Sequence, residues 1–160
     1  MSPESSVHIH EIYIRADAAA IWEAITQPEW TAQYGYRALS EYDLKPGGRF
    51  QCKANLQMRQ MGLPEIICDG EVVEVQPPYK LVQTYRFLFN AEHVAEGFTR
   101  ITWEIVPTGK GFCRLTVTHD TQHATMMTRA ITSKYSVDGG GGWNWILSDL
   151  KSLLESGKTL

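Results

Sequence analysis

Acid–base chemistry in this sequence would centre on His119, the last inward residue of a strand-like run over 112–120. Apolar residues of this run alternate with polar ones, and His119 continues their phase after Val117. Because alternate side chains of a strand share one face, His119 is predicted to point into the interior. An imidazole there could act as an acid or base near neutral pH, with the Tyr85 hydroxyl as a donor. The alternative is a core histidine paired with a backbone carbonyl or a tyrosine hydroxyl.

Metal binding and covalent catalysis have weaker support. His119 and His123 have a spacing seen among metal ligands, but no third ligand lies near them in the sequence. The chain has no Gly-x-Ser-x-Gly elbow, Walker loop, dinucleotide fingerprint or paired metal motif. Cys52, Cys68 and Cys113 are widely spaced in strand-like segments, which is typical of reduced, buried cysteines. We therefore expect no metal and no cofactor.

A stronger indication of function is a set of apolar and aromatic side chains on the inward faces of several predicted strands and of the C-terminal helix. Small molecules typically bind in concave apolar sites that contain a few polar anchors. The alternative is that the same side chains fill a densely packed core. The predicted ligand-binding residues are Phe50, Cys52, Leu56, Met58, Tyr85, Phe87, Trp103, Val117, His119, Trp143 and Leu147.

The element that would close such a site is a helix predicted from Trp143 to Gly157. Its apolar residues recur at helical spacing and form one stripe. The indole of Trp145 falls outside that stripe, so it is expected to cover a neighbouring loop or to contact another subunit, as in a homodimer. The glycines at 139–142 are interpreted as a joint that lets Trp143 approach the sheet.

The remaining elements are two short helices after an opening strand, followed by a strand-rich middle. Asp17 is a predicted N-cap of the first helix, and Pro28 suits the first turn of the second. About six antiparallel strands follow, and the clearest alternation, over 49–58, is predicted to form one half-buried strand. A further helix is predicted over Gln122–Ser136. This order predicts an α+β fold, a curved antiparallel sheet of about six to seven strands around the C-terminal helix.

The composition excludes several classes of protein. Among the 160 residues, 18 are acidic and 15 are basic, and no cluster of Lys and Arg suggests a nucleic-acid surface. No apolar run approaches the about 20 residues that cross a bilayer, and the first residues lack the features of a signal peptide. We expect one domain over residues 1–160, located in the cytoplasm, with neither nucleic acid nor a membrane as a partner.

Several short motifs occur in a fixed order along the chain. They are Ile-Trp-Glu-Ala-Ile-Thr at 21–26 with Pro28-Glu29, Pro-Gly-Gly-Arg-Phe at 46–50, Gly-Glu-Val-Val-Glu-Val at 70–75 before Pro77-Pro78 and Leu81, Leu-Thr-Val-Thr-His at 115–119, and Gly142-Trp143 before Leu147 and Leu150-Lys151. Together they resemble the START/Bet v 1-like superfamily, also called SRPBCC, and within it the group related to the heat-shock-protein-90 ATPase activator homologue. That resemblance implies a helix-grip fold, in which the sheet wraps the C-terminal helix around a cavity.

The family does not imply one function. Its members resemble carriers of lipids or small apolar ligands, polyketide cyclases and aromatases, stress-response proteins and co-chaperones. Our leading hypothesis is a module that binds a small apolar or aromatic molecule in the cavity. The alternatives are a small-molecule enzyme of the cyclase, dehydratase or hydrolase type with His119 as acid or base, and a co-chaperone, which the family name alone suggests.

Overall fold

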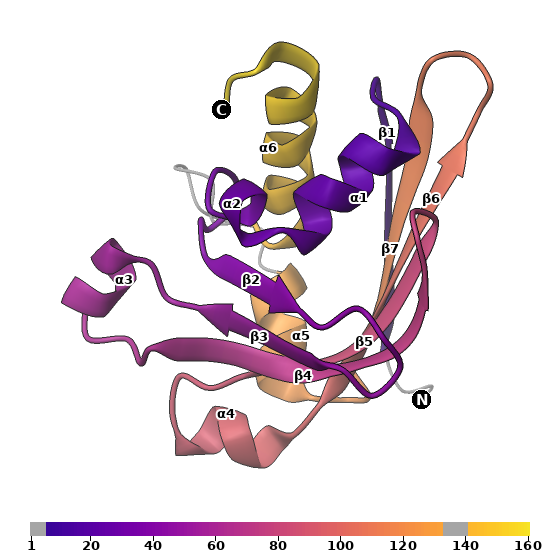
Figure 1. Ribbon diagram of the computed structural model, residues 1–160. Coiled ribbons are helices and arrows are strands. Elements are labelled where there is room, and N and C mark those ends of the chain that lie inside the picture. The colour runs from indigo at the N-terminus through magenta and orange to yellow at the C-terminus, as the bar shows by residue number, and fades with distance from the viewer. Residues whose placement is uncertain (1–5, 133–140) are drawn as a thin grey trace.

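The computed structural model describes residues 6–132 and 141–160, and in them one antiparallel sheet of seven strands carries the fold. The order across the sheet is β1-β7-β6-β5-β4-β3-β2, so the first two strands of the chain lie at opposite edges (Figure 1). All neighbouring strands pair antiparallel. The strands are β1 Val7–Ile14, β2 Leu39–Tyr42, β3 Arg49–Lys53, β4 Ile66–Gln76, β5 Lys80–Phe87, β6 Thr99–Pro107 and β7 Cys113–Asp120.

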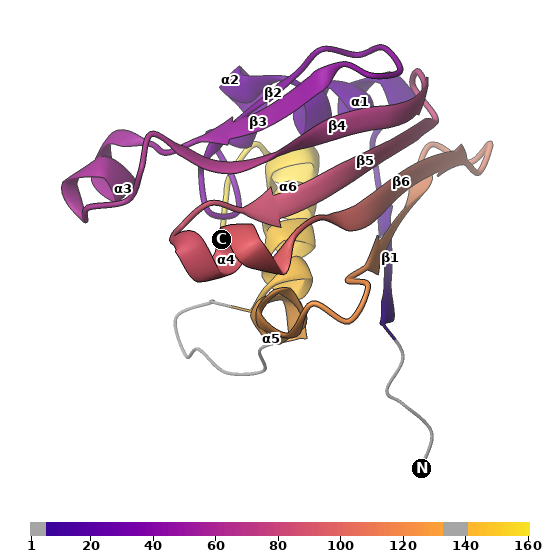
Figure 2. The same cartoon turned by 90° about the horizontal axis from the view of Figure 1, so that it is seen from below.

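Six helices accompany the sheet in the described residues. The long C-terminal helix crosses the inner side of the sheet, and Figure 2 shows the strands curving around it. It packs against β1 and α1, which confirms the predicted α+β helix-grip architecture. None of these helices has both the length and the apolar character needed to cross a bilayer. The helices are α1 Ala18–Thr26, α2 Pro28–Thr31, α3 Leu56–Gln60, α4 Ala91–Glu96, α5 Thr125–Thr132 and α6 Trp143–Ser156.

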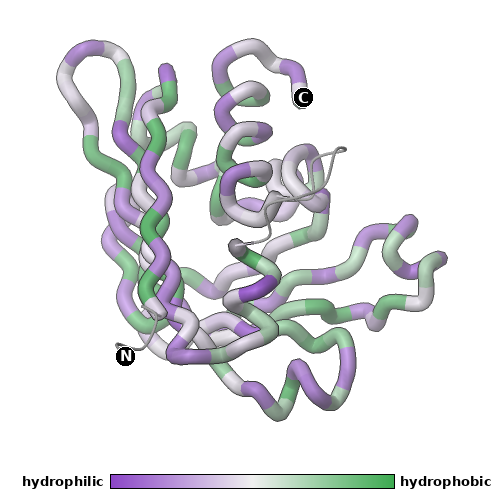
Figure 3. Tube along the Cα trace, turned by 180° about the vertical axis from the view of Figure 1, so that it is seen from behind, coloured by the Kyte–Doolittle hydropathy of each residue, from purple (hydrophilic) through white to green (hydrophobic). Residues whose placement is uncertain are grey.

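The interior divides into a large cluster under α6 and a small cluster between β3 and β4. In the large one the stripe of α6 buries Leu147 and Leu150 completely against the sheet, as its helical spacing predicts. The strands contribute every second residue, and this alternation is visible along the strands in Figure 3. The small cluster contains Phe50, Cys52, Ile67 and Cys68. Tyrosine and phenylalanine rings from β2 and β5 pack against both clusters.

The predicted strand over 49–58 is wrong beyond Lys53. The sheet ladder shifts register after Cys52, and the chain then turns into α3. Asn55 causes this turn, because its side-chain oxygen accepts the backbone N–H of Met58 at 2.9 Å and caps the new helix. As a consequence Leu56 points outward and is 75% exposed. The alternation of apolar and polar residues over 49–58 therefore hid the helix cap at Asn55.

Most predicted helix boundaries are confirmed. Asp17 caps α1 by accepting the N–H of Ala20 at 2.8 Å, Pro28 is the first residue of α2, and Gly157 ends α6. The helix predicted over Gln122–Ser136 begins at Thr125, because left-handed backbone at 122 and 123 makes a turn after β7. Its predicted end at 133–136 lies outside the described residues. The short helices α3 and α4 were not predicted, and both begin at an asparagine cap.

Candidate functional site

A cavity of about 680 Å³ lies between the two clusters, under the first turn of α6. Strands β2 to β7, the segment after α2, the end of α5 and the start of α6 all contribute side chains to its wall. The wall contains several packed aromatic rings. Phe50 lies 4.7 Å from Tyr42 and 5.9 Å from Tyr85, and Trp103 meets Trp143 edge to face at 5.2 Å, ring centre to ring centre. Among the described lining residues one carries a permanent charge, Arg37, and it is exposed. The site is therefore an apolar hollow with neutral polar groups.

The structure brings most of the predicted site residues together. Leu56 lies outside on α3, because the predicted strand turns into that helix. Val117 and Leu147 are fully buried in the large cluster, where tight packing fills the space beside them. Whether any of these residues contacts a ligand stays a prediction. Those that line the cavity are Phe50, Cys52, Met58, Tyr85, Phe87, Trp103, His119 and Trp143.

Gln83 lines the cavity and was missed by the sequence analysis. It is 1% exposed, and its side-chain oxygen accepts two hydrogen bonds, from the Tyr42 hydroxyl at 2.8 Å and the Trp103 indole at 3.0 Å. Two donors on one side fix the orientation of the amide, because the opposite orientation would place its NH₂ group against both. The Nε2 atom of Gln83 then has no partner among the described residues. The phase of β5 contains the relevant signal: Gln83 shares the inward face of Tyr85 and Phe87.

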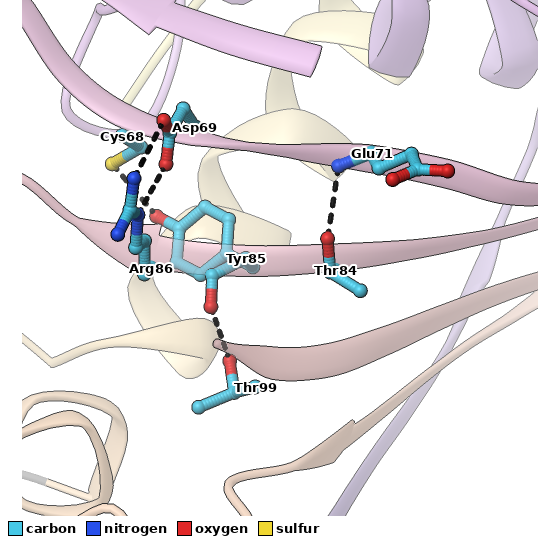
Figure 4. A network of polar contacts seen from close by, with 7 residues as sticks. All are labelled: Cys68, Asp69, Glu71, Thr84, Tyr85, Arg86 and Thr99. Carbon is cyan, nitrogen blue, oxygen red and sulfur yellow. Dashed lines mark hydrogen bonds and ion pairs between the residues drawn. The ribbon is translucent and has the colours of Figure 1, made fainter. Parts of the chain in front are cut away.

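His119 is fully buried at the floor of the cavity, and both of its ring nitrogens are occupied. The Trp143 indole donates to Nδ1 at 3.1 Å. Because an indole can only donate, Nδ1 carries no proton and Nε2 carries it. Nε2 therefore donates to the Thr99 hydroxyl at 2.8 Å. That hydroxyl donates onward to the backbone oxygen of Tyr85 at 2.8 Å (Figure 4), so one chain of hydrogen bonds joins α6 to three strands.

The charge state of His119 follows from the same surroundings. Burial, together with a smaller contribution from the nearby His8, lowers the pKa of its imidazole from 6.5 to about 3. The ring is therefore neutral near pH 7. Its Nδ1 accepts a hydrogen bond from the indole, and its Nε2–H donates one to the hydroxyl. His119 is therefore a paired core histidine, the alternative considered above. Its partners are a threonine and a tryptophan, whereas a backbone carbonyl or a tyrosine hydroxyl was predicted. An acid–base role for His119 has no free nitrogen to act through.

The hydroxyl groups in the cavity are also neutral. Burial raises the pKa of Tyr42 and of Tyr85 well above 10. The Tyr85 hydroxyl is hydrogen-bonded to Cys68 Sγ at 3.3 Å (Figure 4), and the Tyr42 hydroxyl is bonded to Gln83. In the bond at Tyr85 the Cys68 thiol donates and the Tyr85 hydroxyl accepts, so the bond does not use the hydroxyl proton of Tyr85. The predicted donor role of Tyr85 toward a ligand stays a prediction. Within the described residues no group of three or more His, Cys, Asp or Glu side chains could hold a metal ion.

The two remaining sequence predictions concern the start of α6. Trp145 covers a neighbouring loop, since its indole donates to the backbone oxygen of Gly35 at 3.3 Å. Gly142 adopts φ +62°, and a Cβ there would lie 2.6 Å from the backbone oxygen of Ile131. Glycine is required at this position, because any side chain would collide with the end of α5. Its neighbours at 139 and 140 lie outside the described residues.

Comparison with known proteins agrees with this architecture. The family model described as Activator of Hsp90 ATPase homolog 1-like protein matches residues 15–155, almost the whole chain. No curated protein matches it.

Several solved structures share the fold. An HSP90 activator from Plasmodium falciparum is 21% identical, with a TM-score of 0.55 and 72% of each chain covered. CalU16 from Micromonospora echinospora is 18% identical, with a TM-score of 0.63 over 94% of this chain and 76% of that one. The Aha1 dimer from Colwellia psychrerythraea is 18% identical, with a TM-score of 0.62 over 95% of this chain and 98% of that one. At such identities the likeness shows the fold alone.

Proposed function

The chain belongs to the family of Activator of Hsp90 ATPase homolog 1-like proteins, and we propose that this member binds a small apolar or aromatic molecule in the cavity beneath α6. The main support for this proposal is the cavity. Its volume of about 680 Å³ falls within the range of roughly 300–1,000 Å³ that is common for small-molecule sites. Its aromatic walls and few neutral polar groups also fit that class of ligand.

Gln83 supplies the polar anchor in this proposal. A buried N–H donor without a partner costs about 1–3 kcal/mol, and native proteins rarely leave one. The amide of Gln83 lines the cavity with its oxygen fixed by two donors and its NH₂ group unpaired. A ligand oxygen, as in a ketone or a phenol, would satisfy that donor. We therefore expect the preferred ligand to be an aromatic or alicyclic molecule that carries an acceptor oxygen.

The test uses a matched pair of probes, naphthalene and naphthol, which share the ring system and differ in one oxygen. Native mass spectrometry should show one molecule of naphthol per chain, and thermal unfolding should shift upward with naphthol more than with naphthalene. The proposal is overturned if neither probe, nor any member of a wider panel of aromatic ketones and lipids, is retained or raises the unfolding temperature.

Catalysis by His119 is not part of the proposal, because both ring nitrogens are already bonded. A co-chaperone function has support only from the family description and from the name of the Plasmodium falciparum neighbour. A fold shared at that level hosts many functions. Association with a chaperone from the same cell would be the observation that raises this alternative.

We also propose that this protein forms a homodimer. The Colwellia psychrerythraea neighbour is described as a dimer. In this chain the edge strand β1 presents Ile9, 65% exposed, and Tyr13, 51% exposed, on its outer face. Exposed apolar groups on an edge strand are suited to pairing with a second copy.

A further inference from the structure

We propose that Cys52 and Cys68 form an oxidisable dithiol in the cavity wall, which a hydroperoxide that enters the cavity converts into a disulfide between β3 and β4. Formation of this disulfide requires that a small oxidant reaches the cavity. It does not require that the cavity retains a ligand. Failure of the proposed ligand binding would therefore leave this site standing, and the reverse also holds.

The backbone geometry brings the two cysteines within bonding reach. Cys52 and Cys68 are direct partners in the antiparallel ladder of β3 and β4. Facing residues of such a ladder have Cα atoms about 4.5–5.5 Å apart. Disulfides span Cα separations of about 4.4–6.8 Å, so the bond can form without movement of the strands. Both side chains belong to the small buried cluster and both line the cavity, so they lie on the same face of the sheet.

The surroundings distinguish one cysteine as the nucleophile. The Ser40 hydroxyl lies 3.6 Å from Cys52 Sγ, and Cys68 Sγ lies 3.3 Å from the Tyr85 hydroxyl. A hydrogen bond from Cys68 lowers the pKa of the Cys52 thiol, and burial raises the pKa of the Cys68 thiol. The first proton is therefore lost from Cys52, while Cys68 remains a thiol that supports the charge. A thiolate is the form of cysteine that reacts with peroxides.

Access to the pair runs through the cavity. Cys52 is 8% exposed and Cys68 3% exposed, and both contribute to the cavity wall. Figure 4 shows Cys68 and Tyr85 meeting between β4 and β5. A small neutral hydroperoxide can enter an apolar cavity more readily than a charged oxidant can. The third cysteine, Cys113, is buried in the large cluster on β7 and does not line the cavity.

The reaction consumes one hydroperoxide. The Cys52 thiolate attacks the outer oxygen of ROOH, the O–O bond breaks, and a sulfenic acid and an alcohol form once the alkoxide has taken a proton from water. The Cys68 sulfur, deprotonated to the solvent, then attacks the sulfenic sulfur. Hydroxide leaves and is protonated to water as the S–S bond forms. Two thiols are oxidised by two electrons in total, and the peroxide is reduced by the same two.

The test treats the folded protein with hydrogen peroxide and, separately, with tert-butyl hydroperoxide. Intact mass spectrometry should show a loss of about 2 Da, the two thiol hydrogens, which dithiothreitol reverses. Trypsin places the three cysteines on three different peptides, 50–53, 60–80 and 111–114. The expected product is a crosslink between peptides 50–53 and 60–80, while 111–114 remains a free thiol.

The control variant is Cys113→Ser, which should still form the crosslink to the same extent. Cys52→Ser and Cys68→Ser, checked for native circular dichroism, should not lose 2 Da, and Cys68→Ser should accumulate a sulfenic acid at Cys52 that dimedone traps. A crosslink that includes Cys113 would overturn the proposal. So would a folded wild-type protein that shows only separate oxidation of each cysteine, or none.

Discussion

At the scale of single residues, His119 shows how a side chain chosen for its chemistry can serve the architecture instead. Its Nδ1 accepts the Trp143 indole and its Nε2 donates to Thr99, which in turn bonds to the backbone of β5. These bonds position the indole that forms part of the cavity wall. The sequence could predict that His119 points inward, because strand phase is local. It could not predict the partners, which come from residues 20 and 24 positions away.

The buried imidazole makes stability depend on pH. Its pKa is 6.5 in the unfolded chain and about 3 in the folded chain, so the unfolded chain binds more protons between these values. Its contribution is complete above about pH 6.5 and is lost as the pH falls toward 3. Between pH 7 and pH 4 we expect the free energy of unfolding to fall by about 3 kcal/mol from this group alone.

Urea unfolding at both pH values measures this loss, and His119→Gln is the matched control. Glutamine can bond to both former partners and does not titrate, so the variant should be less stable near pH 7 but should lose clearly less stability on acidification. Equal pH dependence in the two proteins would contradict a buried neutral His119.

We predict that Gln83 contributes to the affinity for a ligand that carries an oxygen. Gln83→Leu removes the unpaired donor, so the affinity for naphthol should fall about tenfold relative to naphthalene, which corresponds to about 1.4 kcal/mol. Gln57→Leu is the control, since Gln57 also lines the cavity but is exposed. Isothermal titration of both ligands provides the ratio. An unchanged ratio in Gln83→Leu would remove this residue from the site.

At the scale of elements, the sequence predicted those features that depend on residues close together in the chain. The apolar stripe of α6, the Asp17 cap and the start of α2 at Pro28 all depend on neighbouring residues, and each was found as expected. The failure over 49–58 has the same physical basis, because Asn55 can cap a helix as readily as it can sit in a strand. Which of these it does depends on how β3 shifts against β4, and that is a long-range property.

Gly142 provides a test at the junction between α5 and α6. Gly142→Ala should cost about 1–2 kcal/mol for the left-handed backbone and more for the collision with the Ile131 oxygen at 2.6 Å. Gly157→Ala isolates the first contribution, because Gly157 has φ +77° and no atom near its added Cβ. Urea unfolding should therefore find Gly142→Ala the more destabilised of the two. Equal losses would show that the close approach is not maintained in solution.

At the scale of the whole molecule, the cavity exists because two buried clusters do not merge. Leu147, Leu150 and their neighbours pack the large cluster tightly under α6, whereas the small cluster lies between β3 and β4. The family and the fold could be predicted from ordered motifs along the chain. The size of the hollow could not, because it depends on how closely side chains from distant elements meet.

The proposed homodimer belongs to this scale. Light scattering coupled to size-exclusion chromatography should give twice the 18.1 kDa mass of the chain at high concentration. Ile9→Glu places a charge on the outer face of β1 and should shift the protein to monomer, whereas Val106→Glu, on the exposed face of β6 two strands away, should not. A wild-type protein that remains monomeric throughout would exclude this assembly.

Filling the cavity with a larger side chain tests whether the ligand binds there. Ser40→Phe places a ring into the cavity from β2, and Val73→Phe adds the same ring on the exposed side of β4, away from the cavity. Binding of naphthol is measured by isothermal titration. We expect Ser40→Phe to lower the affinity at least tenfold, about 1.4 kcal/mol, and Val73→Phe to bind as wild type does. Equal affinity in Ser40→Phe and wild type would show that the ligand binds outside the cavity.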